Sequence, residues 1–116
     1  MLKTLEELIA IIRERKKSVS NLSYTKKLIN DKSLRTAKLN EEIGELIEAA
    51  EKDTNKVHEA SDVLYHLLVY LEANDIMIED VMEELKKRKK FEQWNMIRTI
   101  YLLKFLEEKS LVKKFM

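Results

Sequence analysis

The sequence predicts an all-α protein of one domain, and three features of the composition carry that prediction. Proline is absent and Gly44 is the only glycine, so almost nothing interrupts a helix. Strong helix formers such as Leu, Glu, Lys and Ala are abundant, and apolar residues recur at the three- and four-residue spacing of an amphipathic helix. A chain of 116 residues is long enough for one hydrophobic core and too short for two.

The charge and residue composition argues against several classes of protein. Lys and Arg number 22 against 21 Asp and Glu, so the net charge of +1 does not suit a general nucleic-acid-binding protein. The absence of cysteine excludes disulfides, thiolate metal sites and a cysteine nucleophile. No apolar run reaches the roughly 18 residues that span a bilayer, and acids interrupt the apolar N-terminal stretch. We therefore expect a cytoplasmic protein with no signal peptide, no membrane segment and no nucleic-acid partner.

The first part of the chain is expected to form three helices. Apolar residues at helical spacing, followed by the basic end RERKK, predict a helix over residues 3–17. Ser23 is a candidate N-cap for a short helix over residues 24–29. Ser33 is a candidate N-cap for the next helix, which we expect to run to about residue 52.

The rest of the chain is expected to form two or three further helices, which gives five to six in all. A polar turn at residues 53–55 precedes a helix that ends near residue 73 and is apolar on nearly every side after Val63. A fifth helix is expected to begin at residue 76 and to end in the basic run KKRKK, because positive charges stabilise a helix C-terminus. A last amphipathic helix is expected over residues 91–116.

Five carboxylates on the third and fourth helices carry the most distinctive chemistry of the chain. Glu41, Glu42 and Glu45 belong to the third helix, and Glu59 and Asp62 belong to the fourth. At about 100° per residue, Glu42 and Glu45 flank the apolar stripe of their helix, whereas Glu41 points further from it. Mg²⁺ prefers hard oxygen ligands, and two acids one turn apart on each of two facing helices can supply them. The spacing therefore indicates a magnesium site.

Two other interpretations of these acids stay open from spacing alone. Glu pairs are frequent in so charged a sequence, so both motifs could be solvated helix faces. Against this, Glu59 and Asp62 lie on a largely apolar helix, where ionised carboxylates are costly unless they are paired or bound to a cation. A ferritin-like dimetal bundle also projects carboxylates from helices, but it uses Glu-x-x-His motifs that are missing here. Oxygen ligands therefore favour magnesium over a redox metal.

Three residues near the acids are candidates for substrate contacts. His66 lies one turn after Asp62 and could orient a carboxylate or contact a phosphate, although a satisfied core histidine explains it equally well. Lys38 and Arg88 could neutralise phosphate, although isolated cations are more often solvated. Gly44 costs about 1 kcal/mol inside a helix relative to Ala. We therefore expect another helix or a ligand to come close to Gly44.

Four motifs of the sequence occur together in one known family. They are SYTKKL, KLNEEIGELIEAA, EASDVLYHLLVYL and VMEELKKR, and the resemblance that they carry covers roughly residues 3–90. The pair EExxE and ExxD is typical of the wider MazG-like nucleotide pyrophosphohydrolases, and SYT and DVLYHLLV narrow the resemblance. In these motifs the sequence resembles phosphoribosyl-ATP pyrophosphohydrolase, a small all-α enzyme of histidine biosynthesis. The resemblance implies a MazG-like helical bundle over residues 1–90, with residues 91–116 as a helical extension of the same domain.

The resemblance also implies an activity and a set of site residues. The family hydrolyses phosphoribosyl-ATP to phosphoribosyl-AMP and pyrophosphate with Mg²⁺. Carried over by motif, the metal ligands would be Glu42, Glu45, Glu59 and Asp62. Glu41 would support them or help to activate the attacking water, which gives Glu41 and Glu42 the catalytic roles. By the same motifs, Lys38, Tyr65 and His66 would contact the substrate. Arg88 is a further candidate for a substrate contact, on the ground of its charge alone.

We further expect a homodimer, as in this family, because the fourth helix is too apolar for its neighbours in one chain to cover. Two functional alternatives remain at this point. One is a related MazG-like pyrophosphatase that acts on another nucleoside triphosphate. The other is a non-catalytic helical interaction module whose acidic faces are simply solvated.

Overall fold

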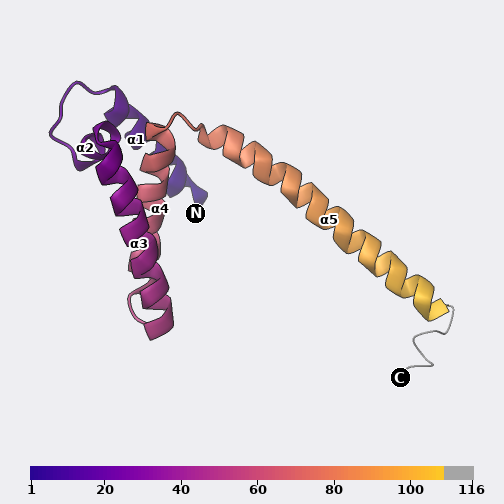
Figure 1. Cartoon of the computed structure of the whole chain (residues 1–116). Coiled ribbons are helices and arrows are strands. Elements are labelled where there is room, and N and C mark those ends of the chain that lie inside the picture. Colours follow the sequence, from indigo (N-terminus) through magenta and orange to yellow (C-terminus); the bar gives the residue numbers. More distant parts are fainter. Residues whose placement is uncertain (109–116) are drawn as a thin grey trace. The chain divides into compact units, whose positions relative to one another are not determined.

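The structure of the chain is a computed structural model that describes residues 1–108. These residues form five helices and no strand, so the all-α prediction is confirmed for them (Figure 1). Contacts divide the chain into a first unit, Met1–Ile78, and a second unit that begins at Glu79. The helices are α1 (Leu2–Lys17), α2 (Tyr24–Asn30), α3 (Lys32–Lys52), α4 (Lys56–Ala73) and α5 (Ile78–Glu108).

Side-chain caps determine where α2 and α3 begin. The hydroxyl of Ser23 accepts the backbone N–H of Lys26 at 3.0 Å, so the predicted N-cap of α2 is confirmed. The prediction that Ser33 caps α3 is wrong. The carboxylate of Asp31 accepts the backbone N–H of Leu34 at 3.0 Å instead. Asp caps a helix as well as Ser does, and the earlier cap lengthens the helix at its start.

Three residues in the left-handed conformation form the turns on either side of α4. Asp53, with φ of 55°, ends α3, Asn55, with φ of 49°, precedes α4, and Asp75, with φ of 57°, follows it. Asn and Asp adopt this conformation more readily than other residues with a side chain. The first turn reverses the chain, so α3 and α4 pack side by side in opposite directions (Figure 1). The acids of the two helices are thereby brought to one interface.

The hydrophobic core of the first unit lies where α1, α2 and α4 meet. Its buried members are Ile12, Leu28, Leu68 and Val69, and both Leu28 and Val69 are fully inaccessible to solvent. This core holds α4, which carries two of the acids, against α1 and α2. Partly buried residues complete it, namely Leu5, Leu8, Ile9, Ile29, Leu34, Tyr65 and Ile78.

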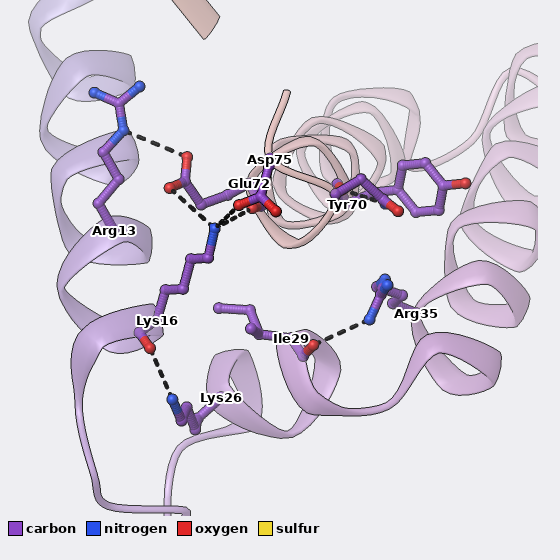
Figure 2. A network of polar contacts seen from close by, with 9 residues as sticks. Arg13, Lys16, Lys26, Ile29, Arg35, Tyr70, Glu72 and Asp75 are labelled. Atoms are coloured by element: carbon purple, nitrogen blue, oxygen red, sulfur yellow. Dashed lines mark hydrogen bonds and ion pairs between the residues drawn. The ribbon is translucent and has the colours of Figure 1, made fainter. Parts of the chain in front are cut away.

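A network of polar contacts joins the C-terminal end of α1 to that of α4 (Figure 2). The ammonium of Lys16 donates to the backbone oxygen of Glu72 at 2.8 Å and to Oδ1 of Asp75 at 2.6 Å. Arg13 Nε lies 3.4 Å from Glu72 Oε2, and the ammonium of Lys26 donates to the backbone oxygen of Lys16 at 2.7 Å. The hydrogen bond from Lys16 lowers the pKa of Asp75. These contacts anchor the end of α4 to α1.

The C-terminal part of the chain forms one helix where two were predicted. α5 continues without a break through the basic run at residues 86–90, so the prediction that a helix ends there is wrong (Figure 1). Positive charges stabilise a helix end but do not create one, and no Gly or Pro follows the run to stop the helix. The predicted helix over residues 91–116 falls partly outside the described residues. Neither α5 nor any other described helix is long and apolar enough to cross a membrane.

Candidate metal centre

Carboxylates from α3 and α4 meet where the two helices pack. One oxygen each from Glu42, Glu45 and Glu59 lie within 4.8 Å of one another. A second group with the same spacing contains Glu59, Asp62 and a nitrogen of His58. Glu59 belongs to both groups, so the four predicted metal ligands are neighbours. We call Glu42, Glu45, Glu59 and Asp62 the acidic cluster.

Two members of the acidic cluster have an oxygen that makes no hydrogen bond. Oε2 of Glu42 and Oε2 of Glu59 are both buried without a partner among the described residues. Burial raises the pKa of Glu42, and the nearby charge of Glu45 raises it further. The pKa of Glu59 is raised by the same two causes. A buried carboxylate oxygen without a donor is costly, so this arrangement favours a bound cation or a proton.

The donor atoms of the acidic cluster fit a hard divalent cation. All four side chains offer carboxylate oxygens, which Mg²⁺ prefers over nitrogen or sulfur. The two oxygens without partners are the groups that such a cation would satisfy. The packing of α3 against α4 therefore brings like charges together, and a bound Mg²⁺ would offset their repulsion.

His58 borders the acidic cluster, although the sequence analysis did not predict it as a site residue. Its Nε2 lies 3.3 Å from Oδ2 of Asp62, and its side chain is 72% exposed. The signal was present in the sequence, because His58 precedes Asp62 by four residues, a spacing at which helical side chains meet. A protonated His58 would compete with a cation for Asp62.

His66 is buried, and both of its ring nitrogens have partners within the chain. Nδ1 lies 2.9 Å from the backbone oxygen of Asp62, and since a carbonyl only accepts, Nδ1 carries the proton in the neutral ring. Nε2 then accepts a hydrogen bond from the hydroxyl of Tyr24 at 3.2 Å. His66 thus links α2 to the part of α4 that carries Asp62. Its direct contact with the substrate stays a prediction.

Tyr65 connects the acidic cluster to an apolar groove. Its hydroxyl lies 2.5 Å from Oγ1 of Thr25, which fixes the ring between α2 and α4. The ring also packs edge-on against His66, with the two centroids 5.1 Å apart. One side of Tyr65 and Asp62 together border a groove of about 570 Å³, which is otherwise lined mainly by apolar residues of α1 and by Leu64. Tyr65 is therefore placed to contact a ligand beside the acids.

Lys38 and Glu41 form an ion pair at the edge of the site. The ammonium of Lys38 lies 3.1 Å from Oε2 of Glu41, and this hydrogen bond raises the pKa of Lys38. Burial raises the pKa of Tyr24, and the positive charge of Lys38 opposes that rise. Lys38 therefore sets a positive charge near Tyr24 and near Glu42, the first residue of the acidic cluster.

Arg88 lies on α5 in the second unit. Its Nε is 4.0 Å from Oε1 of Glu84, and its side chain is 74% exposed. The contact of Arg88 with the substrate stays a prediction.

Most of the chain matches one family of known proteins. Residues 5–89 fit the family model described as phosphoribosyl-ATP pyrophosphohydrolase. This chain belongs to the phosphoribosyl-ATP pyrophosphohydrolase family. It is 46% identical over 88 residues to a phosphoribosyl-ATP pyrophosphatase of Allorhizobium ampelinum, a match that covers 73% of this chain and 85% of the relative. It is 40% identical over 90 residues to that of Haloarcula marismortui, covering 73% of this chain and 92% of the relative.

Membership in the phosphoribosyl-ATP pyrophosphohydrolase family confirms the resemblance seen in the motifs. A histidine biosynthesis bifunctional protein of Pyrococcus furiosus is 42% identical over 90 residues, a match that covers 77% of this chain and 43% of that longer protein. The family match contains the whole acidic cluster, Lys38 and Arg88, and it ends at residue 89. The larger part of α5 therefore lies beyond the region shared with the phosphoribosyl-ATP pyrophosphohydrolases.

Proposed function

We propose that this chain hydrolyses phosphoribosyl-ATP to phosphoribosyl-AMP and pyrophosphate in histidine biosynthesis. The observation that carries the proposal is the cluster of Glu42, Glu45 and Glu59, whose oxygens lie within 4.8 Å of one another inside the family match. Two of these residues have a buried oxygen without a partner, which suits a cation-dependent enzyme better than a solvated helix face. A non-catalytic interaction module would have no need for this arrangement.

The acidic cluster would hold Mg²⁺ through its carboxylate oxygens. When bound, the ion would neutralise charge on the triphosphate and on the departing pyrophosphate. Lys38 adds a positive charge beside Glu42, which suits binding of a further phosphate oxygen. Phosphate binding and charge neutralisation would thus lie on the same side of the α3 and α4 pair.

Hydrolysis also needs a base that accepts a proton from the attacking water. We assign this role to Glu42, whose carboxylate lies within the acidic cluster and so close to the phosphates that the cluster would bind. Water would attack the α-phosphorus, and pyrophosphate would leave in line. Glu41 is held by Lys38, so we assign it the task of orienting Lys38 and its neighbours.

The groove bordered by Tyr65 and Asp62 would bind the part of the substrate that carries no phosphate. Its volume of about 570 Å³ and its leucine-rich lining suit a planar base. His66 does not line this groove, but its ring packs against Tyr65 and accepts a hydrogen bond from Tyr24. His66 would therefore help to position Tyr65. Tyr65 and His66 would therefore set the position of the substrate relative to the acids.

A homodimer would complete the first unit. Leu64 and Leu67 of α4 are 46% and 38% exposed, and Ile47 of α3 is 55% exposed, so one chain leaves part of this helix pair uncovered. Within the part of the chain that the structure describes, a side chain added at Gly44 would meet nothing within 4 Å, which leaves room for a second copy at that position. A close partner there would also explain a glycine that costs about 1 kcal/mol inside a helix. We place this dimeric enzyme in the cytoplasm, which suits a chain without cysteine.

Pyrophosphate release tests the proposed function. The wild-type protein should release pyrophosphate from phosphoribosyl-ATP much faster than from ATP or dCTP, and a chelator should abolish the reaction. Glu42→Gln should abolish it too, whereas Glu48→Gln should not, because Glu48 pairs with Lys52 on the same helix outside the acidic cluster. Faster release from ATP or dCTP would favour the related MazG-like enzymes. No release from any nucleotide would favour the interaction module.

A further inference from the structure

The C-terminal half of α5 exposes a row of large apolar side chains. Within the described residues, no side chain of α5 is buried. This row lies beyond residue 89, where the family match ends, so the shared activity does not account for it. We call it the α5 stripe, and its members are between 48% and 77% exposed: Phe91, Trp94, Ile97, Tyr101, Leu102 and Phe105.

The α5 stripe has the spacing of a helix-pairing seam. Its last five members line a single groove together with Arg98. Residues three, four and seven apart on a helix share one face, and such a face packs against a second helix. An apolar seam of this length costs free energy when it stays in water, so its burial against another surface would be favourable.

Four of the six members of the α5 stripe are placed symmetrically about Arg98. Phe91 and Phe105 lie seven residues before and after Arg98, and Trp94 and Leu102 lie four residues before and after it. Two copies of α5 that run in opposite directions would therefore place Phe91 against Phe105 and Trp94 against Leu102 at both ends of the stripe. Ile97 and Tyr101 have no apolar counterpart at the mirrored positions, and they lie near the centre of the pair.

The charges along α5 favour the same antiparallel arrangement. The basic run at residues 86–90 precedes the stripe, and Glu107 and Glu108 follow it. A parallel pair would place two basic runs side by side, and their like charges would repel. An antiparallel pair places the basic run of one copy beside the acids of the other. Lys90 and Glu108 are five helical turns apart, so they lie on the same flank of the stripe and would meet across the pair.

We infer that α5 pairs with α5 of a second copy of this chain, antiparallel and centred on Arg98. A polar residue at one seam position fixes the register of a helix pair at a cost in stability, and Arg98 has that place here. The two copies of Arg98 would meet at the centre of the pair, where each long side chain can carry its guanidinium group out to water. An anionic lipid surface suits this helix less well. An anionic lipid surface attracts helices with an excess of basic residues, whereas α5 carries seven acids against seven bases, and the part that bears the stripe, residues 91–108, carries three acids against Arg98 and Lys104.

Fluorescence of the full-length protein tests the pairing directly, because Trp94 is the only tryptophan of the chain. As the protein concentration rises, Trp94 emission should shift to shorter wavelength and acrylamide should quench it less. Tyr101→Glu should abolish both changes. Met96→Glu is the matched control, since Met96 is 59% exposed on nearly the opposite face of α5 and its substitution should leave the changes intact. Emission that never shifts with concentration, or that shifts only on addition of phosphatidylserine vesicles, would overturn the pairing.

Single cysteines test the direction, because the chain has no cysteine of its own. In the full-length protein, Arg98→Cys should form a disulfide-linked dimer under mild oxidation, because Arg98 lies at the centre of the antiparallel pair. Phe91→Cys should not, because the two copies of residue 91 would lie about 20 Å apart at a rise of about 1.5 Å per residue. Efficient cross-linking of Phe91→Cys would establish a parallel pair and overturn the inference, as would the failure of both variants to cross-link. Neither readout depends on catalysis or on the dimer proposed for α3 and α4.

Discussion

A carboxylate oxygen of Glu42 on α3 lies within 4.8 Å of one of Glu59 on α4, and each residue also has a buried oxygen without a hydrogen-bond partner among residues 1–108. The turn at residues 53–55 brings these two like charges together, and the core beneath α4 holds them there. Two helices can pack without bringing carboxylates together. The close contact between Glu42 and Glu59 costs free energy in the absence of a cation, and a positively charged ligand would offset that cost.

Glu42→Gln should have opposite effects with and without metal. In EDTA the variant should melt at a higher temperature than the wild type, because the substitution removes one of the clustered charges and its amide can donate to Glu45. In Mg²⁺ the variant should gain less stability than the wild type, because metal affinity should fall by at least about 10- to 100-fold. Thermal melts of both proteins under both conditions measure this. Equal stabilisation by Mg²⁺ in the two proteins would rule out Glu42 as a ligand.

The stability of the metal-free protein should depend on pH through Glu42 and Glu59. Burial raises the pKa of both above the ordinary value of 4.5. A raised pKa in the folded state contributes stability below the unfolded pKa, and this contribution is lost as pH rises through the folded pKa. Urea unfolding in EDTA should therefore show that the wild type loses stability relative to the double variant Glu42→Gln, Glu59→Gln as the pH rises from 4.5 to neutral. A constant difference between the two proteins over that range would contradict the assignment.

Lys16→Met should weaken the anchor between α1 and α4, and the part of this effect that comes from Asp75 should be present only while Asp75 is ionised. Lys16 lowers the pKa of Asp75 below its ordinary value of 3.8. A lowered pKa contributes stability above the unfolded pKa, and this contribution is lost as pH falls through the folded pKa. The wild type should therefore be more stable than the variant near neutral pH, and the gap should narrow in acid. Urea unfolding of both proteins near neutral pH and in acid measures this difference in the free energy of unfolding. A difference that widens in acid would be inconsistent with the ion pair between Lys16 and Asp75.

Tyr24→Phe should destabilise the protein by about 1 kcal/mol, because the variant leaves Nε2 of the buried His66 without its donor. Thr25→Val, which removes the partner of the Tyr65 hydroxyl, is a matched comparison on the same helix. Because Tyr65 borders the proposed groove and Tyr24 does not, Thr25→Val should raise KM more than Tyr24→Phe does. Urea unfolding and steady-state kinetics of the two variants separate these effects. An unchanged free energy of unfolding for Tyr24→Phe would show that the hydrogen bond contributes nothing.

The fold and the acidic cluster were largely predictable from local pattern, because helical spacing alone puts Glu42 and Glu45 on one flank and Glu59 and Asp62 on another. The errors arose where local signals compete. Asp31 and Ser33 are equally good caps, and only the packed helix shows which is used. The basic run at residues 86–90 resembles a helix end but lacks a residue that breaks a helix. The sequence places His58 four residues before Asp62, but only the structure shows that the two side chains meet, at 3.3 Å.

Anomalous diffraction from a crystal grown with Mn²⁺ tests the central claim most directly, since Mn²⁺ accepts the same oxygen ligands as Mg²⁺ and its position can be located by its own signal. We predict a peak between α3 and α4, coordinated by oxygens of Glu42, Glu45 and Glu59, with Asp62 beside it. A protein that hydrolyses its substrate with Mn²⁺ but shows the ion bound elsewhere, with these carboxylates facing solvent, would contradict the account.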